Sequence, residues 1–217
     1  MSETLQLLLV STWQTIYMVV ISTFIATVLG IPLGVLLMVT DKGQILQNST
    51  LNRILSTIVN IFRSIPFVIL LIVLMPFTRL IVGTSIGTTA AIVPLSVAAI
   101  PFMGRLTETA LREVDRGVIE AAQAMGASPF QIVIKVLIPE ALPSIVSGIT
   151  ITAINLIGYS AMAGVIGGGG LGDLAVRYGY QRFMIDIMLW TVAILIAMVQ
   201  LTQLIGDFFV RRLSRNR

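Results

Sequence analysis

Four long stretches of the chain carry no charged side chain, and they limit what this sequence can fold into. The uncharged stretches are residues 4–40, 80–104, 141–172 and 187–206. An apolar run of about 18 residues or more is long enough to cross a bilayer as a helix. Only 11% of all residues are charged, against about 25% in soluble domains. The sequence therefore predicts an integral membrane protein.

The apolar stretches predict an all-α chain with five membrane spans, each near the ~20 residues that a helix needs to cross the bilayer. The spans lie within Trp13–Val39, Ile54–Thr78, Ile86–Met103, Pro143–Ile166 and Asp186–Ile205. Gly30, Pro32 and Gly34 are predicted to kink or loosen one end of the first span. We expect residues 1–217 to form a single membrane domain with one polar loop, at about 104–142.

Lysine and arginine predict how the five spans are oriented. One side of the membrane receives ten of these residues: Lys42, Arg53, Arg105, Arg112, Arg116, Lys135, Arg211, Arg212, Arg215 and Arg217. The other side receives three: Arg79, Arg177 and Arg182. Because basic loops stay in the cytoplasm, the N-terminus is expected outside, and the C-terminus and the polar loop inside. Arg63 lies within the second span, near its basic end.

Composition argues against a catalytic or metal-binding role for this chain. It has no cysteine and no histidine, so the commonest general base and the commonest metal ligands are missing. The glycine-rich GVIGGGGLG at 164–172 lacks the Lys-Ser/Thr that a phosphate-binding loop requires, and it predicts a tight backbone turn instead. No acidic residue is expected in the core of a span, which disfavours an ion-coupled transporter. A channel or scaffold subunit stays open as an alternative.

The polar loop carries a dense set of helix signals. EAAQAM favours a helix, and Gly126 suits the left-handed residue just after its end. Ser128 and Pro129 fit the first positions of a second helix, and Gln131 completes a capping box. That second helix is expected to stop before Pro139. We call residues 117–138, with these two predicted helices and the turn between them, the elbow.

Three interpretations of the elbow are open. It could be a structured connector, but helix connections are usually about 2–8 residues long. It could be a DNA-binding helix-turn-helix, but residues 104–142 hold four basic and five acidic side chains, a net charge unsuited to phosphate. A docking surface for a cytoplasmic protein fits best.

The elbow also resembles the signature of bacterial ABC-importer permeases. That signature is E-A-A, three residues, Gly, nine residues, then I-x-L-P. Here the matching residues are Glu120, Ala121, Ala122, Gly126 and, at the end of Val136-Leu137-Ile138-Pro139, Pro139. The spacing matches, while Val136 and Ile138 differ conservatively. The resemblance implies a type I importer fold in which the elbow is the coupling helix that docks on an ATPase subunit.

Further segments resemble the methionine importer permeases, the MetI type. They are NIFRSIPFVILL (60–71), PFTRLIVGTSIG (76–87) and GYSAMAGVIGGGGLGDLAVRYGY (158–180). The resemblance implies a non-enzymatic subunit in a bacterial inner membrane that passes D/L-methionine or a related amino acid. It implies a homodimer of this chain, two MetN-like ATPases that bind ATP and magnesium, and a MetQ-like lipoprotein. No cofactor or nucleic acid is expected on this chain.

Two sets of membrane residues are candidates for the transport path. Asn155, Tyr159 and Met162 share a face of the fourth span by their 3–4 spacing, although ordinary helix packing explains them equally well. Arg63 is the one charge inside a predicted span. It either snorkels to the cytoplasmic surface or forms an ion pair at an inner gate.

Overall fold

Every regular element in residues 3–214, which the computed structural model describes, is helical. The elements are α1 (Glu3–Val39), α2 (Ser49–Ser64), α3 (Phe67–Val73), α4 (Met75–Val82), α5 (Thr88–Arg112), α6 (Arg116–Ala124), α7 (Pro129–Ile132), η1 (Val133–Leu137), α8 (Ile138–Ala163), η2 (Gly164–Gly168), α9 (Gly170–Leu174), η3 (Ala175–Tyr180) and α10 (Ile185–Ser214). The predicted all-α class is confirmed.

The second predicted span is not one straight helix. Four helical stretches are long and apolar enough to cross a membrane, and the fifth candidate is the pair α2 and α3, bent by 102°. Ile65 between them has extended backbone angles, as expected for a residue that precedes a proline. Pro66 then starts a new helix without its own N–H donor. A further break at Leu74 leads into α4.

The glycines of the first span serve close packing against α5. α1 runs unbroken through Pro32, and Gly30 and Gly34 are buried against α5. A Cβ atom on Gly30 would lie 2.7 Å from the Cβ of Met103, and one on Gly34 would lie 2.5 Å from the Gly104 carbonyl oxygen. These small residues let the two backbones approach closely, as in other membrane helix pairs.

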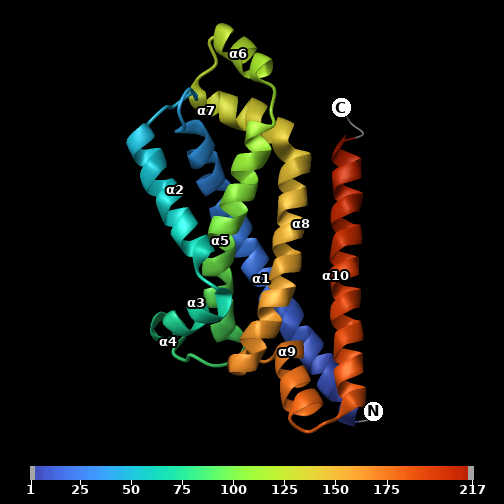
Figure 1. The fold of residues 1–217 in the computed structure, drawn as a ribbon. Coiled ribbons are helices and arrows are strands. Elements are labelled where there is room, and N and C mark those ends of the chain that lie inside the picture. The colour runs from blue at the N-terminus through green and yellow to red at the C-terminus, as the bar shows by residue number, and fades with distance from the viewer. Residues whose placement is uncertain (1–2, 215–217) are drawn as a thin grey trace.

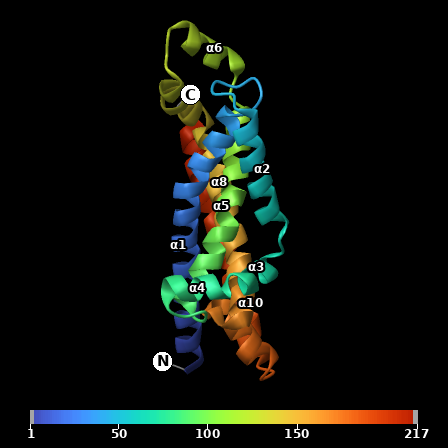
Figure 2. The ribbon, with the colours of Figure 1, turned by 90° about the vertical axis from the view of Figure 1, so that its left-hand side faces the viewer.

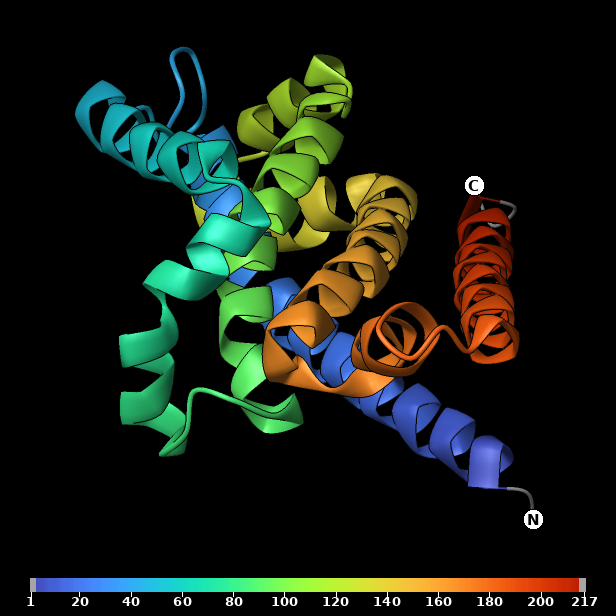
Figure 3. The ribbon, with the colours of Figure 1, turned by 60° about the horizontal axis from the view of Figure 1, so that its bottom comes forward.

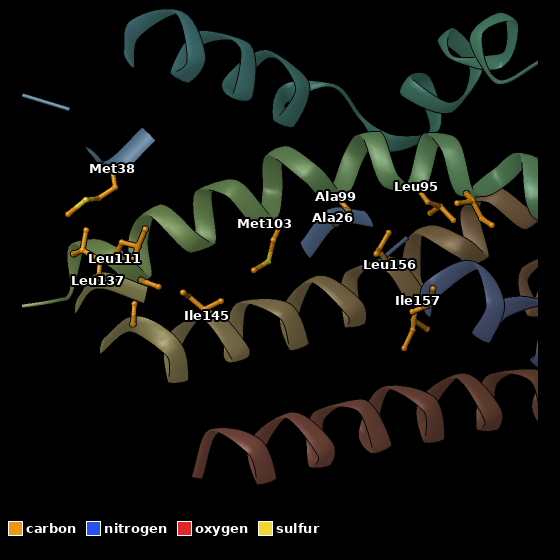
Figure 4. Packing of buried hydrophobic residues seen from close by; sticks show 14 of the residues in the cluster. Ala26, Met38, Leu95, Ala99, Met103, Leu111, Leu137, Ile145, Leu156 and Ile157 are labelled. Atoms are coloured by element: carbon orange, nitrogen blue, oxygen red, sulfur yellow. The ribbon is translucent and has the colours of Figure 1, made fainter. Parts of the chain in front are cut away.

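The core lies where α1, α5 and α8 meet. Figure 3 shows α1 passing behind α5 and α8, which it also contacts. In Figure 4 the Met103 side chain of α5 points toward α8, and Leu156 of α8 points back toward α5. Both side chains are almost completely buried. By contrast, α10 has only three buried residues, so it presents a mainly lipid-facing surface.

The second helix of the elbow does not stop before Pro139, and that prediction is wrong. α7, η1 and α8 form one apolar helical stretch, Pro129–Gly168. The Ile138 N–H donates to the Val133 carbonyl five residues earlier, which widens the turn ahead of Pro139. A π-type turn of this kind accommodates an irregularity inside a continuing helix. The membrane helix is therefore a direct continuation of the elbow.

The N-terminal and C-terminal ends of the described chain lie at opposite ends of the molecule, and the elbow lies at the C-terminal one. Figures 1 and 2 both place α6 and the C-terminal end at one end, and the N-terminal end with α4 and α9 at the other. This is the relative arrangement that five crossings predict. Arg215 and Arg217, counted among the basic residues above, lie outside the described residues.

Candidate functional site: the elbow between α5 and α8

The first helix of the elbow, α6, is delimited by its own side chains and backbone. The Asp115 carboxylate accepts a hydrogen bond from the Gly117 N–H at 2.6 Å and caps the start. At the other end the Ala127 N–H donates to the Ala122 carbonyl, and the Gly126 N–H donates to Gln123. This pair of hydrogen bonds is the pattern that ends a helix at a residue with left-handed backbone angles, and Gly126 has φ +81°. The prediction for Gly126 is confirmed.

The second helix begins with the predicted capping box. The Gln131 N–H donates to the Ser128 hydroxyl at 3.3 Å, while the Ser128 N–H donates to the Gln131 side-chain oxygen at 2.9 Å. Pro129 occupies the first turn, where its missing N–H leaves no bond unmade. Local chemistry thus fixes the angle between α6 and α7 without help from the rest of the chain.

The elbow turns one apolar face inward and another outward. Ile119 and Ala122 are buried against the membrane domain. Met125 and Phe130 are 82% and 74% exposed. Two large apolar side chains at a projecting tip are unfavourable in water, and such a patch marks a contact surface. Sequence reasoning missed both residues, although each stands out as a bulky apolar group in a polar segment.

The motif residues of the elbow differ in how exposed they are. Glu120 and Ala121 are exposed, whereas Ala122 is buried. Within residues 3–214 the Glu120 carboxylate has no hydrogen-bond or ion-pair partner. A role for Glu120 in coupling to the ATPase stays a prediction. Pro139 lies at the start of α8 and is therefore well inside the continuous helical stretch Pro129–Gly168.

The loop that follows α1 lies beside the elbow. Arg116 of α6 donates to the Gly43 carbonyl at 3.5 Å, and Gln44 and Glu120 line the same small polar groove. Next to this groove the Arg112 guanidinium donates to Asp41 at 2.6 Å. That bond, helped by the Lys42 N–H, lowers the pKa of Asp41 below its ordinary value. The Asp41 charge is thus held at neutral pH.

The loop itself is shorter than predicted. α5 continues to Arg112 rather than ending near Met103, because Arg105 and Arg112 pair with Glu108 along one helical face. Only Glu113–Asp115 separate α5 from α6. Glu108, expected in the loop, lies on α5 one turn before its end and is 5% exposed.

The three path candidates on α8 have different surroundings. The Tyr159 ring stacks on Phe67 of α3, with centroids 4.6 Å apart and planes 3° apart. Asn155 is half-buried, and Met162 is exposed on the outer surface of the chain. The stacking holds α8 against the bent second span. A role for these residues in substrate passage stays a prediction.

Arg63 lies in the last turn of α2. It is fourteen residues beyond Ser49 at the elbow end, or about 21 Å along the helix. Snorkelling to the cytoplasmic surface stays a prediction. Arg63 is exposed, and no ion pair to it is formed within the described chain. A gating role stays a prediction.

The glycine-rich segment at the opposite end forms the predicted tight turn. Gly167, Gly169 and Gly170 have positive φ angles. The Gly170 N–H donates to the Gln14 side chain at 2.8 Å, and the Leu171 N–H donates to the Thr15 hydroxyl at 2.9 Å. Both backbone donors are thus satisfied by α1, and the segment fastens the end of α8 to the first helix.

Comparison with protein families and relatives agrees with this geometry. Residues 30–217 match the family of the binding-protein-dependent transport system inner membrane component. The probable D-methionine transport system permease protein MetI of Vibrio cholerae is 58% identical over 208 residues, covering 96% of this chain and 92% of the relative. The D-methionine transport system permease protein MetI of Escherichia coli (strain K12) is 59% identical over 165 residues, 76% of each chain.

Solved structures extend the likeness to three dimensions. A chain described under inward-facing conformations of the MetNI methionine ABC transporter superposes with a TM-score of 0.95 at 54% identity, covering 98% of this chain and 99% of that one. A chain of an amino acid ABC transporter with histidines has a TM-score of 0.78 at 20% identity, covering 95% and 94%. The second match concerns the fold alone.

Proposed function

Because the chain belongs to the family of binding-protein-dependent transport system inner membrane components, we propose that it is the permease subunit of an ATP-driven methionine importer. The observation that carries this proposal is the elbow. It is a self-capped helix pair with exposed Met125 and Phe130 at its tip, built directly onto two membrane helices. The relatives that cover most of the chain are named for D-methionine transport, which supports methionine as the substrate.

The proposed assembly follows the related transporter. Two copies of this chain form the membrane unit, two ATPase subunits bind ATP and magnesium, and a lipoprotein delivers the amino acid from outside. The elbow faces the cytoplasm, as does the C-terminus, while the N-terminus is outside.

The proposed mechanism is mechanical. ATP binding draws the ATPase subunits together, and each carries the elbow docked on it. The elbow is connected rigidly to two membrane helices. Glu113–Asp115 join it to α5, and an unbroken helix joins it to α8. Movement of α6 is thus delivered to two spans at once, and the path opens outward. Hydrolysis releases the ATPase pair and returns the spans.

The proposal is tested by transport in a defined system. The chain is reconstituted in proteoliposomes with an ATPase subunit and a substrate-binding lipoprotein, and uptake of labelled methionine is followed with ATP on the elbow side. ATP-dependent methionine accumulation is expected, with none when the ATPase is left out. Uptake of another amino acid alone would correct the substrate, and uptake without ATP would overturn the proposed function.

A further inference from the structure

Glu108 is a buried carboxylate that the mechanism above does not use. It lies one turn before the end of α5 and is 5% exposed. A buried charge is unfavourable unless partners compensate it. Each of its two oxygens serves a different arginine: Oε2 accepts from Arg105 at 2.6 Å, and Oε1 accepts from Arg112 at 2.8 Å. All three side chains lie on one face of α5, at spacings of three and four residues.

Each arginine passes the contact on to another element. Arg112 donates to Asp41, just beyond the end of α1, at 2.6 Å. Arg105 donates to the Asn60 side chain at 3.0 Å and also reaches the Ser56 carbonyl at 3.5 Å, both on α2. The Glu108 carboxylate on α5 therefore orients two arginine side chains, one of which holds α2 and the other the segment just after α1. We call Asp41, Asn60, Arg105, Glu108 and Arg112 the charge cluster.

The two neighbours depend on the charge cluster to different degrees. α1 already packs on α5 through Gly30 and Gly34, which admit no side chain. α2 has a single buried residue, Val59. Besides the charge cluster, Asn52 is the residue of α2 that reaches another part of the described chain, donating to the Leu37 carbonyl near the end of α1 at 2.6 Å and to the Thr40 hydroxyl at 3.2 Å. α2 is thus attached to α5 mainly by polar contacts and little by burial.

We propose that Glu108 is a positioning residue that makes α2 move with α5. This inference rests on the proposed function, in which α6 drives α5 across the three-residue link. Glu108 keeps the Arg105 guanidinium in reach of Asn60, so α2 follows when α5 moves. Without the contact α5 still receives the motion of α6, but α2 lags, and ATP is hydrolysed with less transport.

The test compares four variants of the complete transporter in proteoliposomes. Glu108→Gln removes the charge that orients both arginines, and Arg105→Gln removes the reach to α2. Arg53→Gln is the matched control, because Arg53 is an exposed arginine of α2 that forms no ion pair within residues 3–214. Asn60→Leu is a second test at an exposed position of α2 and disturbs the fold least.

Two readouts separate positioning from simple damage. The first is methionine taken up per ATP hydrolysed. The second is the nucleotide-induced change in distance between spin labels on the two copies of the chain, placed either at Thr57 of α2 or at Thr109 of α5, both exposed. The chain has no cysteine, so each label is introduced singly, in a complex whose other subunits have been freed of reactive cysteines.

We expect Glu108→Gln and Arg105→Gln to lower uptake per ATP by about fivefold, with ATPase activity kept, while Arg53→Gln behaves as wild type. The label on α2 should lose most of its ATP-dependent distance change, and the label on α5 should keep it. Unchanged uptake per ATP in Glu108→Gln, Arg105→Gln and Asn60→Leu would overturn the inference. If the glutamine variants fail to assemble, Asn60→Leu alone decides. A wild-type complex without ATP-dependent uptake would instead refute the proposed function.

Discussion

Glycines shape both ends of the molecule, but a Cβ atom added to Gly126 in the elbow meets nothing within 4 Å, whereas one added to Gly172 collides with the backbone of Ala161. Gly126 is needed for its φ angle alone, and the surface around it is open. Gly172 is needed because two helical segments touch there. The contrast separates a glycine that a turn on an open surface requires from a glycine that close helix packing requires.

The polar groups of the two ends differ in the same way. At the glycine-rich end, Gln14 and Thr15 satisfy the backbone donors of Gly170 and Leu171 from within the chain. In the elbow, the Glu120 carboxylate has no such partner among the described residues. Unused polar groups and exposed apolar ones lie together at the elbow, as a docking surface requires.

The largest effect is expected from Gly172→Val. A valine there overlaps backbone atoms of Ala161 that cannot rotate away, and overpacking of this kind costs about 3 kcal/mol of stability. The thermal midpoint of the detergent-solubilised chain should fall steeply, or the protein should fail to accumulate. Gly158→Val is the control, because nothing lies within 4 Å of a Cβ there. Equal midpoints for the two variants would contradict the assigned role of Gly172.

The next effect concerns transport rather than folding. Gly126→Val forces a β-branched residue into φ +81°, which costs about 1–3 kcal/mol of backbone strain and changes the angle between α6 and α7. We expect methionine uptake to fall by about tenfold while ATP hydrolysis continues. Gly83→Val is the control, because Gly83 has φ +83° and equally open surroundings at the opposite end. Normal uptake by Gly126→Val at normal expression would contradict a coupling role for Gly126.

A smaller loss is expected from Thr15→Val. The Thr15 hydroxyl accepts the Leu171 N–H inside the protein, and an unsatisfied buried donor costs about 1–3 kcal/mol. Thr12→Val makes the same change where the hydroxyl bonds only to a carbonyl of its own helix. Chemical or thermal unfolding of both variants should show the larger loss for Thr15. A loss no greater than that of Thr12→Val would mean that α1 does not fasten the glycine-rich segment.

The smallest effect is the pH dependence at Asp41. The Arg112 contact lowers the pKa of this carboxyl in the folded chain, so its contribution is present above the unfolded pKa of 3.8 and is lost as the pH falls through the lower folded value. A partly exposed pair contributes only a few tenths of a kcal/mol. Asp41→Asn should flatten the stability profile below about pH 4. An unchanged acid profile would argue against the Asp41–Arg112 pair.

Local signals made the elbow predictable. Gly126, Ser128 and Gln131 lie within one stretch of six residues, so the chain needs no tertiary contact to choose that shape. The bend at Pro66 was less visible, because an apolar run does not reveal whether it crosses the membrane straight. Pro139 misled the prediction, since only the widened turn before it keeps the helix unbroken. Glu108 had the right spacing to its arginines, but a buried cluster cannot be recognised before the neighbouring helices are placed.

The central claim is that the exposed tip of the elbow binds the ATPase subunit, and co-purification tests it most directly. The tagged chain is expressed with the ATPase and purified in mild detergent as wild type, as Phe130→Asp, and as the control Phe183→Asp. Phe183 is 82% exposed in the turn before α10, away from the elbow. The account predicts one ATPase per chain for wild type and Phe183→Asp, and loss of the ATPase for Phe130→Asp with the permease intact. Full ATPase retention by Phe130→Asp, or a wild-type chain that purifies alone under several mild conditions, would contradict it.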